Sequence, residues 1–367
     1  MDARTPLPRS SSCPESVRRP RHEARAPCRG PEPAQEENVS RKNVLAVIPP
    51  QVGGREAGSA LAGLLADRAH VTVVESAGED PGALAAAQVI ITALSPVGAD
   101  HLRAAPLLEL VQCVGHGHDH VDLAAAERHA VTVCTIASSG AEGNSVAEHA
   151  FALILACAKR IVPAHTALAA GDWALPRLRP HLTELAGKTL GVVGLGHIGR
   201  DVARKAAAFD MNVLYSSPRR APRDVEERTG ARWTGLEELL RASDVVTLHA
   251  PLNDGTRHLL DARRLALLKP TAVVVNTARG PLIDQDALAA ALEDGRIAAA
   301  GIDVFDPEPP PPGSRLLGAP NVVLTPHAGA VTRETLVRIA LAAVENVRRH
   351  LDGAEPHDVV AGPGATR

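Results

Sequence analysis

The amino-acid sequence predicts an α/β fold made of two domains, the second of which is inserted into the first. Short apolar runs alternate with segments of helical spacing, a pattern typical of parallel β–α units. The alternation begins at KNVLAVI (42–48), pauses in a polar, proline-containing stretch (171–187) and restarts with KTLGVVGLGHIGR. A chain of 367 residues is long enough to form two hydrophobic cores.

The elements follow in order along the chain. Before the pause we expect strands in KNVLAVI, VTVVE, AQVIITAL, LLELVQCVG and AVTVCTI, with a helix in LAGLLADRA. After it we expect strands in KTLGVVG, MNVLYSS, SDVVTLH, AVVVNTA, IAAAGIDVF and NVVLTPH, with helical segments between them. Two long helices are also expected, one over 144–160 capped by Asn144 or Ser145, and one over 332–353 stopped by Gly353.

These elements divide the chain into four parts. Residues 43–145 and 332–356 are predicted to form one domain, and residues 146–331 form the inserted domain. Residues 357–367 are expected to be a flexible tail. Residues 1–42 hold seven prolines and nine lysines or arginines with few large apolar side chains, which predicts disorder. This extension is either without a role or a targeting or partner-binding segment.

The composition argues against several classes of protein. A net charge of −3 gives no support to binding of nucleic acid or of a membrane surface. The longest apolar run, AFALILACA, is about half the length of a membrane span, and the pattern of a secretory signal is not seen. Five cysteines without CxxC spacing predict reduced thiols. We therefore expect a cytoplasmic protein.

The stretch GVVGLGHIGR predicts a dinucleotide-binding loop. It carries G-x-G-x-x-G at Gly194, Gly196 and Gly199, directly after an apolar strand and at the start of a helix. The glycines allow a tight turn, close approach of backbone amides to a pyrophosphate, and close packing of helix and strand. His197 and Ile198 complete the loop, and the positive end of the helix attracts the phosphates.

The end of the following strand predicts which dinucleotide binds. An acidic residue there would bond both ribose hydroxyls of NAD. This chain has Ser217 in the expected place, followed by Arg219 and Arg220. A hydroxyl and two guanidinium groups suit the 2′-phosphate of NADP. NADP(H) is therefore favoured, with NAD(H) possible, and the alternative is a solvated basic turn without a role.

Three later motifs end strands or follow them: NTARG, DVFDPEP and TPHAG. In this order after GLGHIG, they resemble the D-isomer-specific 2-hydroxyacid dehydrogenases, and the resemblance extends from about residue 43 to residue 355. It implies two Rossmann-like or flavodoxin-like domains, with the nucleotide-binding domain inserted into the substrate domain. It also implies a homodimer, with which the apolar helix at 144–160 is compatible.

The resemblance also implies roles for individual residues. Arg279, Glu308 and His327 match the catalytic residues of the family. Thr277, Ala278 and Asp303 match positions beside the nicotinamide, and Ala250 and Pro251 match the lining of the cofactor cleft. For Asp303, a role as a helix cap or turn residue is the alternative.

These residue types suit reduction of a keto group. Hydride transfer to the keto carbon places negative charge on the carbonyl oxygen. Arg279 is expected to hold the substrate carboxylate and the keto oxygen, and His327, as an imidazolium, to donate the proton. Glu308 is expected to favour the protonated ring.

We call the stretch GHGHDHVD (115–122) the substrate loop. The resemblance places His116 and Gly117 where backbone amides meet the substrate carboxylate. His116 either binds a second anionic group or faces solvent. Three histidines and an aspartate in this loop also suggest a metal, but the spacing H-x-H-D-H is one residue short of the hydrolase pattern, and further ligands are not found downstream. No metal is therefore expected.

The predicted activity is NAD(P)H-dependent interconversion of a small 2-keto acid and its D-2-hydroxy acid. Glyoxylate or hydroxypyruvate is the first choice of substrate. 3-Phosphoglycerate is the second, and phosphite or formate the third. A non-catalytic NAD(H)-sensing protein of the same fold and a metal-dependent hydrolase are the alternatives from other classes.

Overall fold

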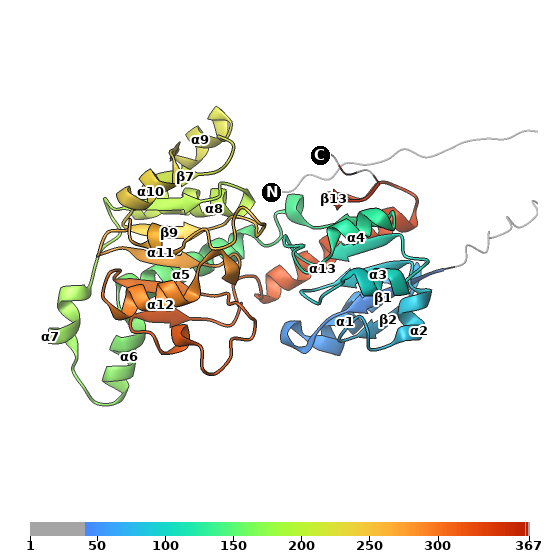
Figure 1. Ribbon diagram of the computed structural model, residues 1–367, viewed down its shortest axis with the longest axis horizontal. Coiled ribbons are helices and arrows are strands. Elements are labelled where there is room, and N and C mark those ends of the chain that lie inside the picture. Colours follow the sequence, from blue (N-terminus) through green and yellow to red (C-terminus); the bar gives the residue numbers. More distant parts are fainter. Residues whose placement is uncertain (1–40, 364, 366–367) are drawn as a thin grey trace, which may run out of the picture. The chain divides into compact units, whose positions relative to one another are not determined.

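The computed structural model describes residues 41–363 and 365. The predicted disordered extension, residues 1–42, lies outside the described part of the chain except for Arg41 and Lys42. Order begins with strand β1 at Lys42. Residues from Arg41 onward form one unit, and Figure 1 shows in it two sheets with helices on their faces.

The first sheet has six strands in the order β13-β5-β4-β3-β1-β2. Strands β1 to β5 are parallel to one another, and their order 2-1-3-4-5 is that of flavodoxin-like folds. Their apolar side chains are buried on both faces because helices cover the sheet on either side. Its strands and helices are β1 Lys42–Val47, α1 Gly54–Leu65, β2 Ala69–Val74, α2 Pro81–Ala86, β3 Val89–Thr92, α3 Ala99–Ala104, β4 Leu110–Cys113, α4 Leu123–Arg128 and β5 Thr132–Cys134.

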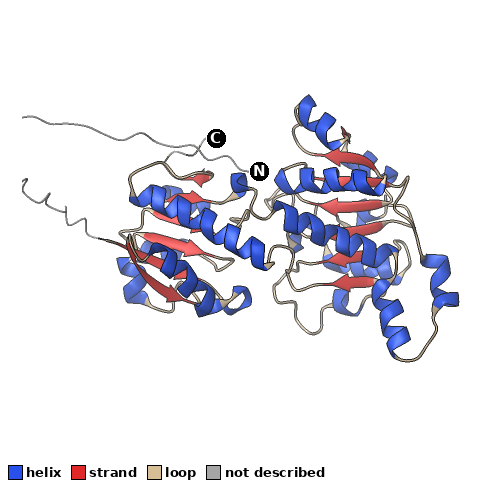
Figure 2. Cartoon of the chain, turned by 180° about the vertical axis from the view of Figure 1, so that it is seen from behind, coloured by secondary structure: helices blue, strands red, loops and turns tan. Residues whose placement is uncertain are grey.

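The second sheet has seven parallel strands in the order β12-β11-β10-β9-β6-β7-β8. This is the Rossmann order with one added strand, and the strand order reverses between β6 and β9. Figure 2 shows helices packed over a face of this sheet. Its elements are β6 Thr189–Val193, α8 His197–Ala206, β7 Asn212–Ser216, α9 Arg223–Thr229, β8 Ala231–Trp233, α10 Leu236–Ala242, β9 Val245–Leu248, α11 Ala262–Leu265, β10 Val273–Asn276, α12 Gln285–Glu293, β11 Ala299–Ile302 and β12 Val322–Leu324. The predicted fold class is confirmed.

Short 3₁₀ helices connect several of these elements. They are η1 Pro50–Val52, η2 Ala137–Ser139, η3 Arg179–His181, η4 Ala207–Phe209, η5 Gly280–Leu282 and η6 Arg315–Gly318. We keep the predicted division of the chain into a substrate domain and an inserted nucleotide domain as a proposal, which the two sheets support.

Helix α5 (Gly143–Ala158) leads from the first sheet to the second and packs against α8, β10 and β11. The predicted caps were wrong, because Asn144 and Ser145 lie inside the helix and are engaged in other contacts. The Asn144 amide donates to Glu148 at 2.6 Å, and the Ser145 hydroxyl donates to the carbonyl oxygen of Gly329 at 2.6 Å. Glu142 occupies the capping position and makes no side-chain capping bond.

Two short helices, α6 (Ile161–Ala169) and α7 (Leu175–Leu178), extend away from the second sheet in Figure 1. We call residues 161–182 the arm. Among the described residues no single helix is long and apolar enough to cross a membrane. Helices α5 and α6 pass that test only as a pair bent by 60°, and most of the apolar residues of α5 are buried in the fold.

The chain returns to the first sheet through α13 (Arg333–Leu351). The Thr332 hydroxyl caps this helix by accepting from the Thr335 amide at 3.2 Å. Strand β13 (Val359–Ala361) then pairs antiparallel with β5. The prediction of a flexible tail over 357–367 was therefore wrong at residues 359–361.

Asn346, buried in α13, explains why this tail is ordered. Its side-chain amide donates to the carbonyl oxygens of Thr135 and His357, each at 3.1 Å, and its oxygen accepts from the His357 amide at 2.9 Å. One side chain thus fixes the chain just before β13. Because this three-residue strand depends on a side chain of another element, its own residues do not predict it.

We expect Asn346→Ala to destabilise the fold by roughly 2–4 kcal/mol, because buried polar groups of the tail lose their partners. The denaturation midpoint should fall, and amide hydrogen exchange over residues 357–361 should accelerate. Glu345→Ala, at the exposed neighbouring position, is the matched control. Unchanged exchange over 357–361 in Asn346→Ala would contradict this account of the tail.

Candidate active site

The glycine loop lies between β6 and α8, at the point where the strand order of the second sheet reverses. Gly194 has a φ of +95°, and a Cβ atom there would lie 2.7 Å from the carbonyl oxygen of His249. A Cβ atom on Gly199 would lie 2.0 Å from the carbonyl oxygen of Gly194. Gly196, by contrast, faces open space. The loop therefore has the close packing and the free approach that a bound pyrophosphate requires.

The turn after β7 differs in detail from its prediction. The Ser217 hydroxyl accepts a hydrogen bond from the Leu195 amide at 3.0 Å, so it joins this turn to the glycine loop. Arg220 forms a two-point pair with Glu226, at 2.9 and 2.8 Å. Hydrogen bonds from Arg220 and Tyr215 lower the pKa of Glu226 to about 2, so the carboxylate is ionised and compensates Arg220. Arg219 is exposed, without an ion-pair partner in the described part of the chain.

Arg279 follows β10 and is held at several points. The Asn276 side chain accepts from the Ala278 amide at 3.0 Å and donates to the Arg279 carbonyl at 2.8 Å, which shapes the turn. Nε of Arg279 donates to Asp119 at 2.9 Å, and Nη1 donates to the Ala278 carbonyl at 2.8 Å. Burial would raise the pKa of Asp119, but the charge and hydrogen bond of Arg279 hold it below its usual value.

The substrate loop lies directly against this guanidinium group. A Cβ atom on Gly117 would lie 1.5 Å from Nη2 of Arg279. The structure therefore brings together Arg279 from the second sheet and Gly117 from the loop after β4, as the sequence predicts for two parts of one substrate site.

His327 and Glu308 form a second pair. Nδ1 of His327 lies 2.8 Å from Oε2 of Glu308, and Oε1 of Glu308 accepts from the Phe305 amide at 2.8 Å. With Nδ1 facing the carboxylate, Nε2 is the ring nitrogen left to exchange a proton with a substrate. Both side chains remain partly accessible, with 27% and 33% of their surface exposed.

Asp303 organises the loop that carries His327. Its carboxylate accepts from the amides of Ala328 and Gly329 at 2.8 and 3.0 Å, and from the Thr325 hydroxyl. Nε2 of His149 lies 3.2 Å from it. Burial would raise the pKa of Asp303, but these hydrogen bonds, led by His149, lower it. The predicted place of Asp303 beside the nicotinamide stays a prediction, and its bonds to the Ala328 and Gly329 amides fit the alternative role of a turn residue.

The remaining predicted cofactor positions lie at the carboxyl ends of neighbouring strands. Ala250 and Pro251 follow β9, and Thr277 and Ala278 follow β10. The Thr277 hydroxyl is buried and has no hydrogen-bond partner among the described residues. An unsatisfied polar atom at this place fits a bound nicotinamide group, which would supply the missing partner. His197 and Ile198 begin α8, as predicted for the loop that meets the phosphates.

The histidines of the substrate loop are not arranged for a metal. In residues 41–363 and 365, no group of three or more His, Cys, Asp or Glu side chains is placed to hold one. Burial lowers the pKa of His118, and that of His120 to about 4, so both rings are neutral near pH 7. His116 contacts Glu142 through Nδ1.

Four residues in this site were not predicted: Asp119, Glu142, His149 and Thr325. Asp119 lies in the substrate loop, where the sequence suggested a role for its carboxylate only as a metal ligand. Glu142 directly precedes α5 and His149 lies in it. The sequence of this helix is mostly apolar, so it predicted burial and no role for the two polar side chains. Thr325 is the first residue of TPHAG, but only the histidine of that motif was assigned a role.

Comparison with known proteins places this geometry in a family. Residues 151–329 match the family model described as D-isomer specific 2-hydroxyacid dehydrogenase, NAD binding domain. The chain is 42% identical over 269 residues to glyoxylate reductase of Aeropyrum pernix, covering 72% of this chain and 79% of that protein. The chain belongs to the D-isomer-specific 2-hydroxyacid dehydrogenase family.

Other comparisons agree. Hydroxypyruvate reductase of Thermotoga maritima is 37% identical over 265 residues, covering 72% of this chain and 84% of that protein. The crystal structure of D-lactate dehydrogenase from Aquifex aeolicus, complexed with NAD and lactic acid, superposes with a TM-score of 0.78 and is 30% identical. It covers 88% of this chain and all of that one. The predicted family and the predicted class of enzyme, an oxidoreductase of CH–OH donors that uses a nicotinamide cofactor, are confirmed.

The roles of individual site residues stay predictions, which substitution tests directly. We expect His327→Ala and Arg279→Ala to remain folded and to lose most turnover, the histidine variant by about 10²- to 10⁴-fold in kcat because the proton donor is removed. Initial rates of NAD(P)H oxidation measure the loss. His129→Ala, at an exposed position at the end of α4, is the control. Near-normal rates in either active-site variant would refute its assignment.

Proposed function

We propose that this dehydrogenase reduces a small 2-keto acid, glyoxylate or hydroxypyruvate, to the D-2-hydroxy acid. Two features of the structure carry the proposal. The Arg279 guanidinium lies against the substrate loop, and His327 pairs with Glu308. The similarity to reductases of glyoxylate and hydroxypyruvate supports this substrate class.

The proposed reaction consumes a 2-keto acid, one NAD(P)H and one proton, and forms a 2-hydroxy acid and NAD(P)⁺. A bound nicotinamide supplies the hydride. Arg279 orients the substrate carboxylate and stabilises charge that develops on the keto oxygen. His327 donates a proton from Nε2 to that oxygen. Glu308 accepts from Nδ1, which holds the ring in place with Nε2 directed away from the carboxylate.

A screen of NAD(P)H oxidation at 340 nm with about a dozen 2-keto acids tests this function. The same screen separates it from a phosphoglycerate dehydrogenase and from a sensor. Fastest turnover of glyoxylate or hydroxypyruvate supports the proposal. A preference for 3-phosphohydroxypyruvate would instead make the chain a phosphoglycerate dehydrogenase. Binding of NAD(H) without turnover of any acid would indicate a sensor.

We also propose that NADPH is preferred over NADH. Ser217 stands where an acidic residue would repel the 2′-phosphate, and Arg219 is an exposed cation in the same turn. Arg220 is assigned a smaller share of the phosphate contact than the sequence suggested, because Glu226 compensates its charge.

We expect Arg219→Ala to lower kcat/KM for NADPH about tenfold or more, since a charged hydrogen bond is lost, with little change for NADH. Ser217→Asp should reverse the preference, because a carboxylate bonds ribose hydroxyls and repels a 2′-phosphate. Arg223→Ala is the control, since this arginine lies on α9 and pairs with Glu227. Equal kcat/KM for both cofactors in the unmodified protein would contradict the proposal.

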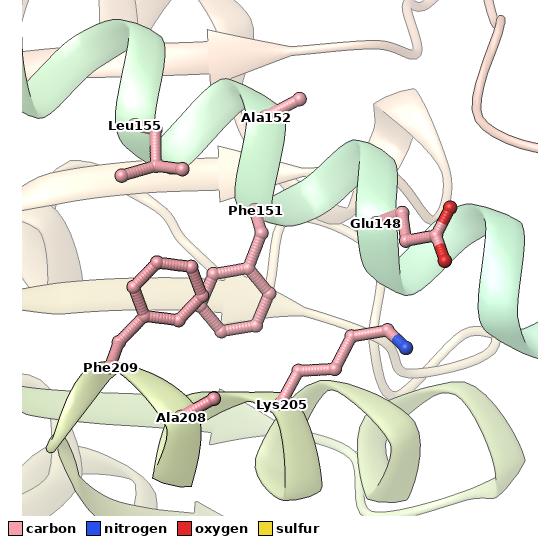
Figure 3. A pocket seen from close by; sticks show the side chains of 7 residues that line it. All are labelled: Glu148, Phe151, Ala152, Leu155, Lys205, Ala208 and Phe209. Carbon is pink, nitrogen blue, oxygen red and sulfur yellow. The ribbon is translucent and has the colours of Figure 1, made fainter.

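We propose further that the protein is a homodimer that associates through the arm and α5. Large apolar side chains of the arm are exposed, led by Trp173 at 71% and Leu168 at 58%. An apolar hollow lies between α5 and the end of α8, where Phe151 and Phe209 stack with ring centroids 4.9 Å apart (Figure 3). Exposed apolar surface is typical of an interface.

Charged substitutions in the arm test the dimer. We expect the double variant Leu168→Asp, Trp173→Asp to sediment as a monomer, because burial of two carboxylates in an apolar interface is costly. Leu107→Asp, at a leucine in the turn between α3 and β4 that is 57% exposed, is the matched control and should leave the mass unchanged. A monomeric unmodified protein, or a dimeric double variant, would overturn the proposal.

A cytoplasmic location is proposed as well. Cys113, Cys134 and Cys157 are free and buried. Burial raises the pKa of each thiol to about 12, so these side chains stay protonated and act as small apolar groups. Free thiols are typical of a reducing compartment.

A further inference from the structure

The side chain of His116 has no role in the reaction described above, yet its ring is held in one orientation. It lies in the substrate loop, between Gly115 and Gly117, and Gly117 packs against the Arg279 guanidinium. Its ring centroid lies 6.4 Å from that of His197, the first residue of α8, in an edge-on arrangement. The ring therefore lies between the candidate substrate clamp and the helix that is expected to hold the cofactor.

Glu142 fixes this ring from behind. The Glu142 carboxylate, in the segment just before α5, contacts Nδ1 of His116. Glu142 is only 8% exposed, and a Cβ atom on Gly115 would lie 3.1 Å from its Oε1 atom, so the carboxylate has little room to move away. A buried carboxylate needs such a partner. Because the carboxylate is an acceptor, the ring hydrogen lies on Nδ1, the nitrogen that faces Glu142.

The other ring nitrogen is left without a partner. Nε2 of His116 is buried and makes no hydrogen bond to any described residue. Buried polar atoms of proteins are nearly always paired, so an unpaired atom beside a ligand site points to a group of the ligand. His118 and His120 of the same loop also have unpaired ring nitrogens, but only the His116 ring is fixed by a carboxylate on its other nitrogen. Arg279 and His327 already account for the carboxylate and the keto oxygen of a 2-keto acid. The next atom of such a substrate is its C3 substituent.

We propose that His116 binds a hydroxyl group on C3 of the substrate and thereby selects 3-hydroxy-2-keto acids, of which hydroxypyruvate is the smallest. The inference rests on the proposed function and narrows its substrate class.

The tautomer explains why a hydroxyl suits this nitrogen better than an anionic group. With the Nδ1 hydrogen directed at Glu142, Nε2 of a neutral ring is an acceptor, and it becomes a donor when the ring is protonated. A hydroxyl group pairs with it in both states. A phosphate dianion or a carboxylate pairs only with the protonated ring, and it also meets the negative charge of Glu142 on the far side of the same ring.

Pyruvate and hydroxypyruvate differ only by this hydroxyl, so the ratio of their kcat/KM values isolates the contact. We expect the unmodified protein to favour hydroxypyruvate, and His116→Leu to lower the ratio about tenfold to a hundredfold through the lost hydrogen bond. His116→Gln, whose amide both donates and accepts, should keep part of the preference. Glu142→Ala should lower the ratio in the same direction, because the ring is no longer oriented. His129→Leu, at the exposed end of α4, should leave the ratio unchanged.

Each outcome is decisive because both substrates are measured on the same preparation, so partial unfolding cancels in the ratio. An unchanged ratio in His116→Leu overturns the proposal. If that variant instead raises the KM for the cofactor equally with both acids, the hydroxyl partner is a ribose of the cofactor, and the proposal is wrong. Preferential loss of 3-phosphohydroxypyruvate turnover would show an anionic ligand and would also overturn it. If the unmodified protein reduces no 2-keto acid, the proposed function itself fails.

Discussion

The position of His327 depends on one buried carboxylate, that of Asp303. Only 1% of this residue is exposed, and an ionised carboxylate is tolerated there because amides, a hydroxyl and an imidazole surround it. The Asp303 carbonyl accepts from the His327 amide at 2.7 Å, while its side chain binds the two residues that follow. His327 itself has a left-handed backbone, with a φ of +54°, which costs roughly 1–2 kcal/mol. The hydrogen bonds of Asp303 offset this cost and hold the ring against Glu308.

The same network connects His327 to α5. His149 of α5 reaches Asp303 and also lies 2.9 Å from the Thr325 hydroxyl, while Ser145 binds the carbonyl oxygen of Gly329. Glu142, just before α5, holds His116 of the substrate loop. One helix therefore supports both the proposed proton donor and the proposed selector of the C3 group. A displacement of α5 would therefore move both of these groups together. Because α5 is long and largely buried, it holds them more firmly than a surface helix would.

The sequence predicted the parts of the molecule whose signal is local. Buried parallel strands are short apolar runs, so their places in the chain follow from the sequence. The glycine loop and the motifs that carry Arg279, Glu308 and His327 come after such runs, and the structure has strands before each of them. Contacts between distant residues were not predictable in this way. The pairing of Arg220 with Glu226 and the support of β13 by Asn346 arise only once helices and turns are packed. The cap of α5 failed for the same reason, since Asn144 and Ser145 have the right residue types for capping and are used elsewhere.

The pairing of Arg279 with Asp119 bears on the role proposed for Arg279, that of holding the substrate carboxylate. Asp119 and Ala278 take hydrogen bonds from Nε and Nη1, and Gly117 lies directly under Nη2. The guanidinium plane is thus fixed before an acid arrives, so less side-chain entropy is lost on binding. Asp119 and Gly117 come from the loop after β4, whereas Arg279 follows β10, so the clamp is assembled from the two sheets. Any side chain at position 117 would displace the guanidinium, which gives this glycine a steric role beyond offering its amide.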